Sequence, residues 1–201
     1  EVLCTKTESN KNIPKSNFRF HYFDFSRSFN IYNFFISIIK IRKEIKNINP
    51  NIIHLHTPSA SIITRIGLIG LKKKFKIVYT CHAFYFSSRG NIISKFILFF
   101  LEYIASFNTN LFLFQSFADY KLSLKFFSNK KNSFVIGNGV DEKIFGHYMS
   151  EDKIKLLKKN YEFKYNKVIV INGRLVKEKG YIELIESCKT INCDILIIGY
   201  V

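Results

Sequence analysis

Short apolar runs alternate with longer amphipathic segments along most of this 201-residue chain, and that alternation constrains the fold more than any other feature. The apolar runs are continuous, as is typical of strands buried in a parallel sheet. The segments between them are long enough to form helices of ten or more residues. The sequence therefore predicts an α/β fold built on parallel sheets. We expect strands at 18–25, 51–56, 75–82, 110–114, 133–140, 167–173 and 193–201, and helices at 30–48, 59–73, 91–107, 116–127, 150–161 and 180–191.

The alternation breaks near 141–150, where "DEKIFGHYMS" leads into a charged helix. We place a domain junction there, with one domain at 1–146 and a second at 150–201. Two strands and one complete helix follow the charged helix, which is too little for an independent α/β domain. The sequence thus predicts that the second domain is incomplete.

The chain is strongly basic, with 31 Lys and Arg against 15 Asp and Glu and a net charge of +16. Such an excess favours anionic partners, which include nucleic acid, acidic lipid surfaces and phosphorylated substrates. Lys, Asn, Ile, Phe and Tyr are abundant throughout, however, as an AT-rich genome would produce. The lysines are also spread along the chain rather than clustered on one element. We therefore expect no nucleic-acid partner and keep a nucleic-acid-binding protein as a remote alternative.

Cysteine spacing and hydropathy bear on the location of the protein. The four cysteines, at 4, 81, 188 and 193, form no CxxC pair, so we expect neither a metal site nor disulfides, and a reducing cytoplasm. The most lipid-like stretch, 92–114, is interrupted by Lys95 and Glu102, whereas a spanning helix needs about 20 nearly uncharged residues. We therefore predict no membrane span, while a helix lying on a membrane surface stays open.

Polar residues gather where the predicted strands end, in "HLHTP", "TCHAF", "IGNGVD" and "INGRLVKEKG". In doubly wound sheets, ligands bind at the carboxyl ends of the strands. In the last of these turns, Gly173 allows a close approach, Arg174 offers a two-pronged donor to phosphate and Lys179 adds a positive charge. The helix that follows presents its amide groups to an anion. This pattern alone fits a phosphate site and a solvated basic turn equally well.

The histidines at these strand ends also have two interpretations. His54 and His56 alternate along a strand, so their side chains point the same way. A metal site would need a third ligand, and the sequence indicates none nearby. His82 ends its strand alone, and such a histidine is more often structural than catalytic.

Taken in order, these segments resemble the GT-B glycosyltransferases of family 4, which build bacterial capsular and exopolysaccharides. The resemblance covers most of 19–201, and five motifs stand in family order. They are "NIIHLHTPSASIITRIG", "KIVYTCHAFYF" (with Ala83 where glycine is usual), "FLEYIASFNTNLFLFQSFADY", "VIGNGVDEKIF" and "INGRLVKEKGYIELIES".

The resemblance implies a GT-B architecture, in which an N-terminal, acceptor-side Rossmann-like domain (1–146) and a nucleotide-sugar-binding domain (150–201) face a cleft. It implies transfer of a sugar, with retention of configuration, from a UDP- or GDP-linked donor to a saccharide acceptor that we expect to be lipid-linked. It implies no obligatory metal and no cofactor. The expected location is the cytoplasm, with peripheral contact to the inner membrane.

The resemblance also assigns roles to individual residues. His82 matches the catalytic histidine that faces the sugar. Gly173, Arg174 and Lys179 match the positions that hold the donor diphosphate. Three further residues would line the cleft: His56, Thr57 and Asn138.

Two departures from the family pattern open a second hypothesis. The family begins with a strand and a glycine-rich loop, whereas this chain opens at what resembles the second strand. The E-x7-E motif of the family lies beyond the segment that matches "GRLVKEKG". Glu178 and Glu186 have that spacing, but they flank the wrong helix, so we interpret them as a helix-start acid and a solvated face. The alternative function is therefore a catalytically inert, truncated fragment of such an enzyme.

Overall fold

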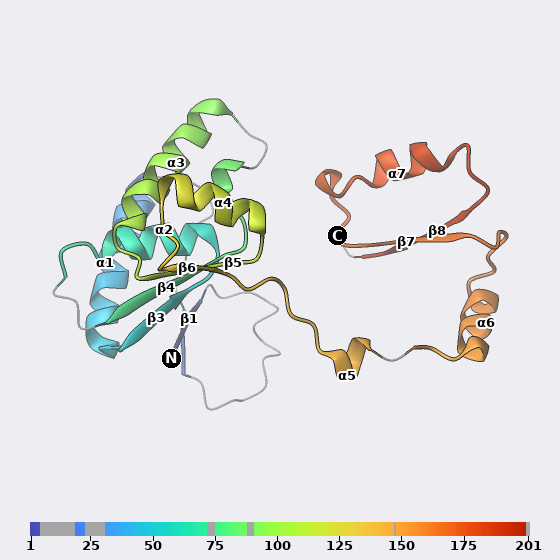
Figure 1. Cartoon of the computed structure of the whole chain (residues 1–201), viewed down its shortest axis with the longest axis horizontal. Helices are drawn as coiled ribbons and strands as arrows, with labels where there is room; N and C mark the ends of the chain where they lie inside the picture. The colour runs from blue at the N-terminus through green and yellow to red at the C-terminus, as the bar shows by residue number, and fades with distance from the viewer. Residues whose placement is uncertain (5–18, 23–30, 72–74, 88–90, 147, 200–201) are drawn as a thin grey trace. The chain divides into compact units, whose positions relative to one another are not determined.

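The computed structural model describes residues 1–4, 19–22, 31–71, 75–87, 91–146 and 148–199 (Figure 1). The chain divides into two compact units, Glu1–Gly139 (unit 1) and Val140–Val201 (unit 2). That division falls a few residues before the predicted junction. The roles of 1–146 and 150–201 as acceptor-side and donor-binding domains stay predictions.

Unit 1 is built on a four-stranded sheet in the order β3-β4-β5-β6, and every neighbouring pair is parallel. The strands are β3 (Ile52–Leu55), β4 (Lys76–Cys81), β5 (Leu111–Phe114) and β6 (Ser133–Val135). The predicted α/β fold with a parallel sheet is thus confirmed. Because all four strands run the same way, their carboxyl ends lie along one edge of the sheet.

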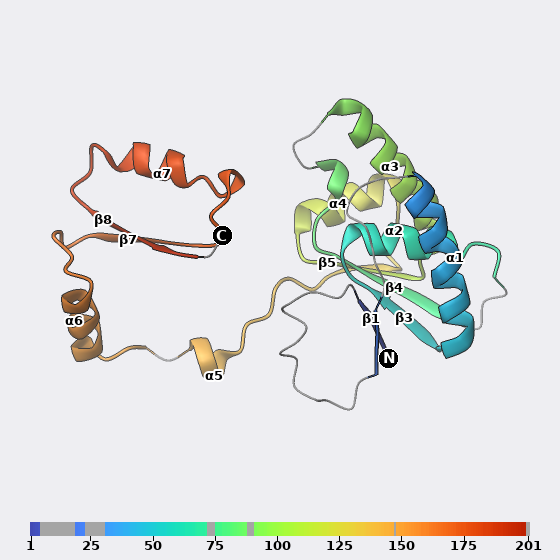
Figure 2. The same ribbon diagram turned by 180° about the vertical axis from the view of Figure 1, so that it is seen from behind.

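Helix α1 (Ile31–Ile48) precedes β3. The strands are connected in turn by α2 (Pro58–Gly67), α3 (Ile92–Ser106) and α4 (Phe117–Phe126), with a short 3-10 turn at Tyr85–Ser87 before α3. In both Figure 1 and Figure 2, α2, α3 and α4 lie on the same face of the sheet. The helix predicted at 59–73 ends earlier than expected, at Gly67, so its predicted C-terminal end is wrong. The chain leaves α2 after Gly67 and turns through Gly70, whose φ of 78° favours glycine. Residues 72–74 lie outside the described part.

The core of unit 1 joins the inward face of the sheet to α1 and to the segment after β4. Aromatic rings dominate it: Phe84 lies 6.1 Å from Phe114 and 5.3 Å from Phe127 between ring centroids. The abundant phenylalanine therefore has a packing role here. The buried apolar residues of this core include Ile41, Ile45, Ile53, Leu55, Ile77, Tyr79, Cys81, Phe84, Phe112, Phe114 and Phe127.

A buried ion pair lies beside this core. Arg65 of α2 donates from Nη2 to both carboxylate oxygens of Glu102 in α3, at 2.8 and 2.9 Å. Their side chains are 0% and 3% exposed. The Arg65 guanidinium also stacks 4.1 Å from the centre of the Tyr79 ring, and Asn108 donates to the Arg65 carbonyl. The pair thus ties two helices to the sheet, and this explains a buried glutamate within a largely apolar helix.

Two short strands, β1 (Val2–Cys4) and β2 (Phe20–Tyr22), form a separate parallel pair. β2 falls within the strand predicted at 18–25, of which 18 and 23–25 lie outside the described residues. The sequence prediction missed β1, so the expectation that the chain opens at the strand 18–25 is wrong. Three residues carry too little pattern to be recognised as a strand.

In the described part of unit 2, β7 (Val168–Asn172) pairs in parallel with β8 (Asp194–Ile198). Its helices are α5 (Glu142–Phe145), α6 (Glu151–Asn160) and α7 (Tyr181–Cys188), with a 3-10 turn, η3, at Lys177–Lys179. A Cβ on Gly199 would collide with the carbonyl oxygen of Gly173, so glycine is required where the chain leaves β8. This contact brings the end of β8 against the turn that follows β7.

Candidate functional site

Three histidines and a glutamine meet at the carboxyl ends of neighbouring strands in unit 1. His54 and His56 come from β3 and the residue after its end, His82 follows β4, and Gln115 follows β5. The rings of His54 and His56 lie 4.4 Å apart between centroids, and those of His56 and His82 lie 5.5 Å apart. The expectation that His54 and His56 point the same way is confirmed. We call these four residues the histidine cluster.

Hydrogen bonds run through the histidine cluster. Nδ1 of His82 lies 2.8 Å from Oε1 of Gln115, and Nε2 of His82 lies 3.3 Å from Nδ1 of His56. His54 is linked to the neighbouring strand β4, since its Nε2 lies 2.8 Å from the hydroxyl of Thr80 in that strand. All the polar groups thus come from one edge of the sheet, as expected for a ligand site of this fold.

The residues around His82 fix its place. The Gln115 N–H donates to the Cys81 carbonyl at 3.4 Å, which ties the two strand ends together.

Burial raises the pKa of the Asp119 carboxyl, whereas the Phe84 N–H that donates to it lowers that pKa. Burial also raises the pKa of the Cys81 thiol to about 12, so this neighbour of His82 is a protonated core residue rather than a nucleophile.

Thr57 lies in a strained turn between the histidine cluster and α2. Its φ is 60° and its ψ is 133°, an uncommon conformation for a β-branched residue. Pro58 follows at the first position of α2. Such strain occurs at functional sites where the surroundings hold the backbone in place. Here it lets α2 start at Pro58, only two residues after His56.

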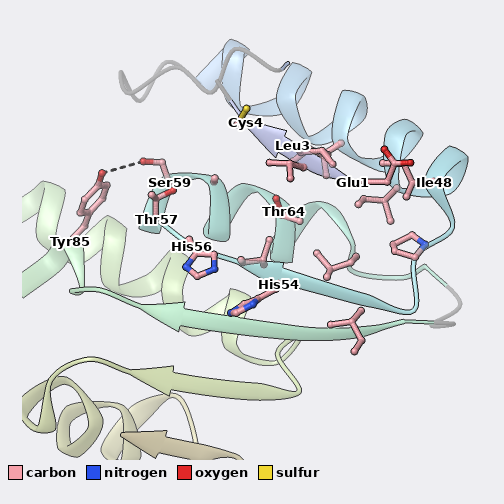
Figure 3. Close-up of a pocket in the computed structure, with 18 residues that line it drawn as sticks. Glu1, Leu3, Cys4, Ile48, His54, His56, Thr57, Ser59, Thr64 and Tyr85 are labelled. Atoms are coloured by element: carbon pink, nitrogen blue, oxygen red, sulfur yellow. Dashed lines mark hydrogen bonds between the residues drawn. The ribbon is translucent and has the colours of Figure 1, made fainter. Parts of the chain in front are cut away.

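A cavity of about 700 Å³ opens beside His54 and His56 (Figure 3). Its walls come from β1, the C-terminal half of α1, β3 and the start of α2. Ser59 and Tyr85 close one end, where the two hydroxyls lie 3.4 Å apart. Polar residues thus line the end at the histidine cluster, and most of the remaining wall is apolar: Val2, Leu3, Ile41, Ile45, Ile48, Pro50, Ile52, Ile53 and Leu55.

Metal binding does not follow from this arrangement. No group of three His, Cys, Asp or Glu side chains among the described residues is placed to hold a metal ion. His82 is a third histidine close to His54 and His56, which the sequence did not indicate. However, His56 and His82 are hydrogen-bonded to each other. Metal-independent chemistry stays a prediction.

Unit 2 carries the basic turn "NGRLVKEKG" at the carboxyl end of β7. Gly173 continues the strand pair, since its N–H donates to the Ile198 carbonyl at 2.9 Å. The Tyr181 hydroxyl donates to the Gly173 carbonyl at 2.6 Å. Gly180, with a φ of 73°, then starts α7. The turn is thus closed back onto the first residue of α7, with Arg174 and Lys179 between two glycines.

Arg174 is paired within this turn. Its Nη2 donates to Oε1 of Glu178 at 2.9 Å, and both side chains are exposed. Glu186 forms a similar exposed pair with Lys189 at 2.8 Å. Glu178 and Glu186 thus make two separate surface ion pairs.

The structure brings some predicted site residues together and leaves others apart. His56 and His82 are in direct contact, and Thr57 adjoins them. Asn138 is exposed beyond β6, and no hydrogen bond described for the chain joins its side chain to the histidine cluster. Sequence reasoning missed Gln115, although its position directly after the apolar run 111–114 is the signal that marked His82.

The pKa of His56 provides a test of the cluster geometry. Burial lowers it first, and the neighbouring imidazoles of His54 and His82 lower it further. Because a proton then binds less tightly in the folded state, the contribution of His56 to stability falls as the pH drops below about 6.5. In an NMR titration of the ring carbons, we expect His56 to titrate below that value. His54→Gln should raise the midpoint, and a wild-type midpoint at or above 6.5 would contradict the geometry.

Comparison with known proteins gives the family. A sequence model of Glycosyltransferase Family 4 matches residues 1–143. A Klebsiella pneumoniae protein described as an uncharacterized 41.2 kDa protein in the cps region is 30% identical over 162 residues. That match covers 77% of this chain and 42% of the relative, so the chain spans less than half of its length.

Two solved structures share the fold. A glycosyltransferase from Rickettsia africae has a TM-score of 0.64 at 17% identity, covering 99% of this chain and 59% of that one. A structure of S. aureus MnaA with UDP has a TM-score of 0.53 at 12% identity, covering 90% and 48%. The fold is therefore of the GT-B type. Because the family match spans residues 1–143, well over half of the sequence, the chain belongs to glycosyltransferase family 4.

Proposed function

We propose that the protein transfers a sugar from a UDP- or GDP-linked donor to a saccharide acceptor, with retention of configuration, in cell-surface polysaccharide assembly. The observation that carries this proposal is the placement of polar groups at strand carboxyl ends in both units of a family 4 glycosyltransferase. The relative encoded in a cps region supports the polysaccharide role. The UDP in the MnaA structure supports a nucleotide-linked donor.

Under this proposal, the basic turn of unit 2 holds the diphosphate. Arg174 is suited to two parallel hydrogen bonds with phosphate oxygens, and Lys179 supplies a second positive charge. The amide groups at the start of α7 add donors in the same region. As the glycosidic bond breaks, negative charge grows on the leaving diphosphate, and these groups stabilise it. We propose that they do so without a metal ion or cofactor.

We propose that His82, in unit 1, is the catalytic residue that faces the donor sugar. Its imidazole is held between Gln115 and His56, so it is oriented before any ligand binds. His56 and Thr57 would complete the sugar-facing surface. Asn138 stays a weaker candidate, because it is exposed and no hydrogen bond among the described residues joins its side chain to this cluster.

The acceptor we propose is lipid-linked, and α3 is the element we expect to meet the membrane. No described helix is long and apolar enough to cross a bilayer. Large apolar side chains on α3 are nevertheless exposed: Ile92, Ile93, Phe96, Ile97, Phe100, Tyr103 and Phe107. At 100° per residue they occupy an arc of roughly 140°, and Glu102 lies on the opposite side.

The distribution of charge supports an anionic bilayer as the partner of α3. Residues 1–139 contain 20 Lys and Arg against 6 Asp and Glu, whereas residues 140–201 contain 11 against 9. Nearly all of the excess positive charge thus belongs to the unit that carries α3. Apolar insertion and attraction to acidic headgroups strengthen surface binding together. We propose a peripheral location on the cytoplasmic face of the membrane.

Product analysis tests the proposed reaction. The 201-residue chain is incubated with UDP- and GDP-sugars and a membrane extract that supplies lipid-linked saccharides, and the products are followed by proton NMR. We expect nucleoside diphosphate and a new glycosidic linkage with the anomeric configuration of the donor, both lost in His82→Ala. Inversion would contradict the retaining mechanism. No transfer with any donor would favour the catalytically inert fragment.

A neighbouring acid makes the diphosphate site testable by a gain of affinity. Glu178 pairs with Arg174, so a bound diphosphate must compete with this carboxylate. Exposed pairs contribute about 0.2–1 kcal/mol, so Glu178→Gln should tighten UDP binding by about 1.5- to 5-fold in titration calorimetry. Glu186→Gln, which removes the equivalent acid from the Lys189 pair, should leave affinity unchanged. Equal effects of the two substitutions would place the nucleotide elsewhere.

A further inference from the structure

Gln115 occupies a position in unit 1 from which it can control the chemistry of His82. It follows β5 directly, and β5 is the parallel neighbour of β4, with Phe114 opposite Cys81. Its backbone N–H donates to the Cys81 carbonyl, and its side chain reaches the ring of the next residue, His82. Both its backbone and its side chain thus fix it to the end of β4.

The hydrogen bond between the two side chains determines where the proton of His82 lies. The atom 2.8 Å from Nδ1 of His82 is Oε1 of Gln115. With the Gln115 amide in this orientation, its carbonyl oxygen accepts and cannot donate, so Nδ1 is the nitrogen that carries the proton. In a neutral imidazole the other nitrogen, Nε2, is then an acceptor.

The same reasoning continues to His56. Nε2 of His82 lies 3.3 Å from Nδ1 of His56, and since Nε2 accepts, Nδ1 of His56 donates. His56 then presents an unprotonated Nε2. His56 also lines the cavity beside β3, together with Thr57 and Ser59. One amide oxygen thus sets the proton positions along two imidazoles that end at a cavity wall.

We propose that Gln115 is a positioning residue that fixes His82 as the Nδ1–H tautomer and thereby aligns the His82–His56 pair for the donor sugar. Only the last step, the alignment of the His82–His56 pair for the donor sugar, rests on the proposed function. The tautomer itself is a property of the chain without ligand. In this proposal Gln115 acts through His82, the ring that its side chain contacts.

Nitrogen NMR of the imidazole rings tests the tautomer without any substrate. In the wild-type chain near pH 8, we expect the His82 signals of a protonated Nδ1 and an unprotonated Nε2. Gln115→Leu keeps the size of the side chain and removes the acceptor, so His82 should shift toward the Nε2–H form. Gln115→Glu restores an acceptor and should restore the wild-type tautomer. Asn51→Leu, at an exposed position just before the amino end of β3, should leave the His82 signals unchanged.

Turnover with a nucleotide-sugar separates the positioning role of Gln115 from the proposed function of the protein. We expect Gln115→Leu to lower kcat at least about 10-fold with little change in KM, and Gln115→Glu to recover most of that loss. A wild-type His82 protonated at Nε2, or no shift in Gln115→Leu, would overturn the positioning role. A shifted tautomer with unchanged kcat would also overturn it. A wild-type chain with the expected tautomer and no turnover would contradict the proposed function but not the fixed tautomer.

Discussion

Replacing Glu102 with alanine should destabilise unit 1 by about 3–5 kcal/mol, because the Arg65 guanidinium would be left buried without its counter-ion. Both oxygens of Glu102 accept from Arg65, and neither side chain can relax into water at 0% and 3% exposure. Folded domains are stable by only about 5–15 kcal/mol. The substitution would therefore remove a large share of the stability that positions α2 and α3.

Hydrogen exchange at the amides of Tyr79 and Phe112 measures this effect in unit 1 alone. The matched control is Glu186→Ala, whose pair with Lys189 has the same 2.8 Å separation but exposures of 62% and 64%. We expect that control to leave exchange at Tyr79 and Phe112 unchanged. Combining Arg65→Met with Glu102→Leu should recover most of the loss, because no charge would remain buried. Equal exchange in Glu102→Ala and wild type would contradict a buried pair.

The second large effect concerns the exposed apolar face of α3. Phe96 and Phe100 are 71% and 53% exposed, one turn apart on the same face. Fully burying a phenylalanine side chain gains about 1.5–3 kcal/mol. Replacing both with serine should therefore weaken binding to vesicles containing phosphatidylglycerol on the order of 100-fold, as measured by co-sedimentation.

An exposed phenylalanine in unit 2 is the control for this experiment. Phe145 is 74% exposed in α5, so Phe145→Ser removes the same kind of side chain from another surface. We expect its binding to match wild type. Binding should also fall with added salt, because acidic headgroups attract the basic unit. Wild-type binding by the α3 variant would show that another surface meets the membrane, and no binding by wild type would remove the membrane proposal.

Periodic apolar sequence was sufficient to predict most elements of the fold. β3, β4, β5, β7 and β8, with the helices α1, α3, α4, α6 and α7, lie at the predicted positions. Their patterns are long enough to separate strand from helix. β1 and α5 span only three and four residues, which is too short for a periodic pattern. β1 depends on pairing with the distant β2, whereas α5 is a single turn capped locally by Asp141. The early end of α2 arises from the turn through Gly70.

The candidate site was predictable in position but not in its connections. Strand ends marked His56 and His82 in unit 1 and Arg174 in unit 2, because the carboxyl ends of parallel strands meet at one edge of each sheet. The contacts from His82 to Gln115 and from Arg65 to Glu102 join residues 33 and 37 positions apart. Such pairings follow from strand order and register, which a single sequence does not specify.

Nucleotide binding at the basic turn tests the central claim most directly. Titration calorimetry of the 201-residue chain with UDP and with GDP would compare wild type, an Arg174→Ala/Lys179→Ala variant, and Lys177→Ala, which removes a lysine from the same turn. We expect one of the two nucleotides to bind wild type and Lys177→Ala with equal affinity. The double variant should bind it at least about 100-fold more weakly, since hydrogen bonds to charged groups contribute about 1.5–3 kcal/mol each. Equal affinity in the double variant and wild type, or binding of neither nucleotide to wild type, would contradict the donor site.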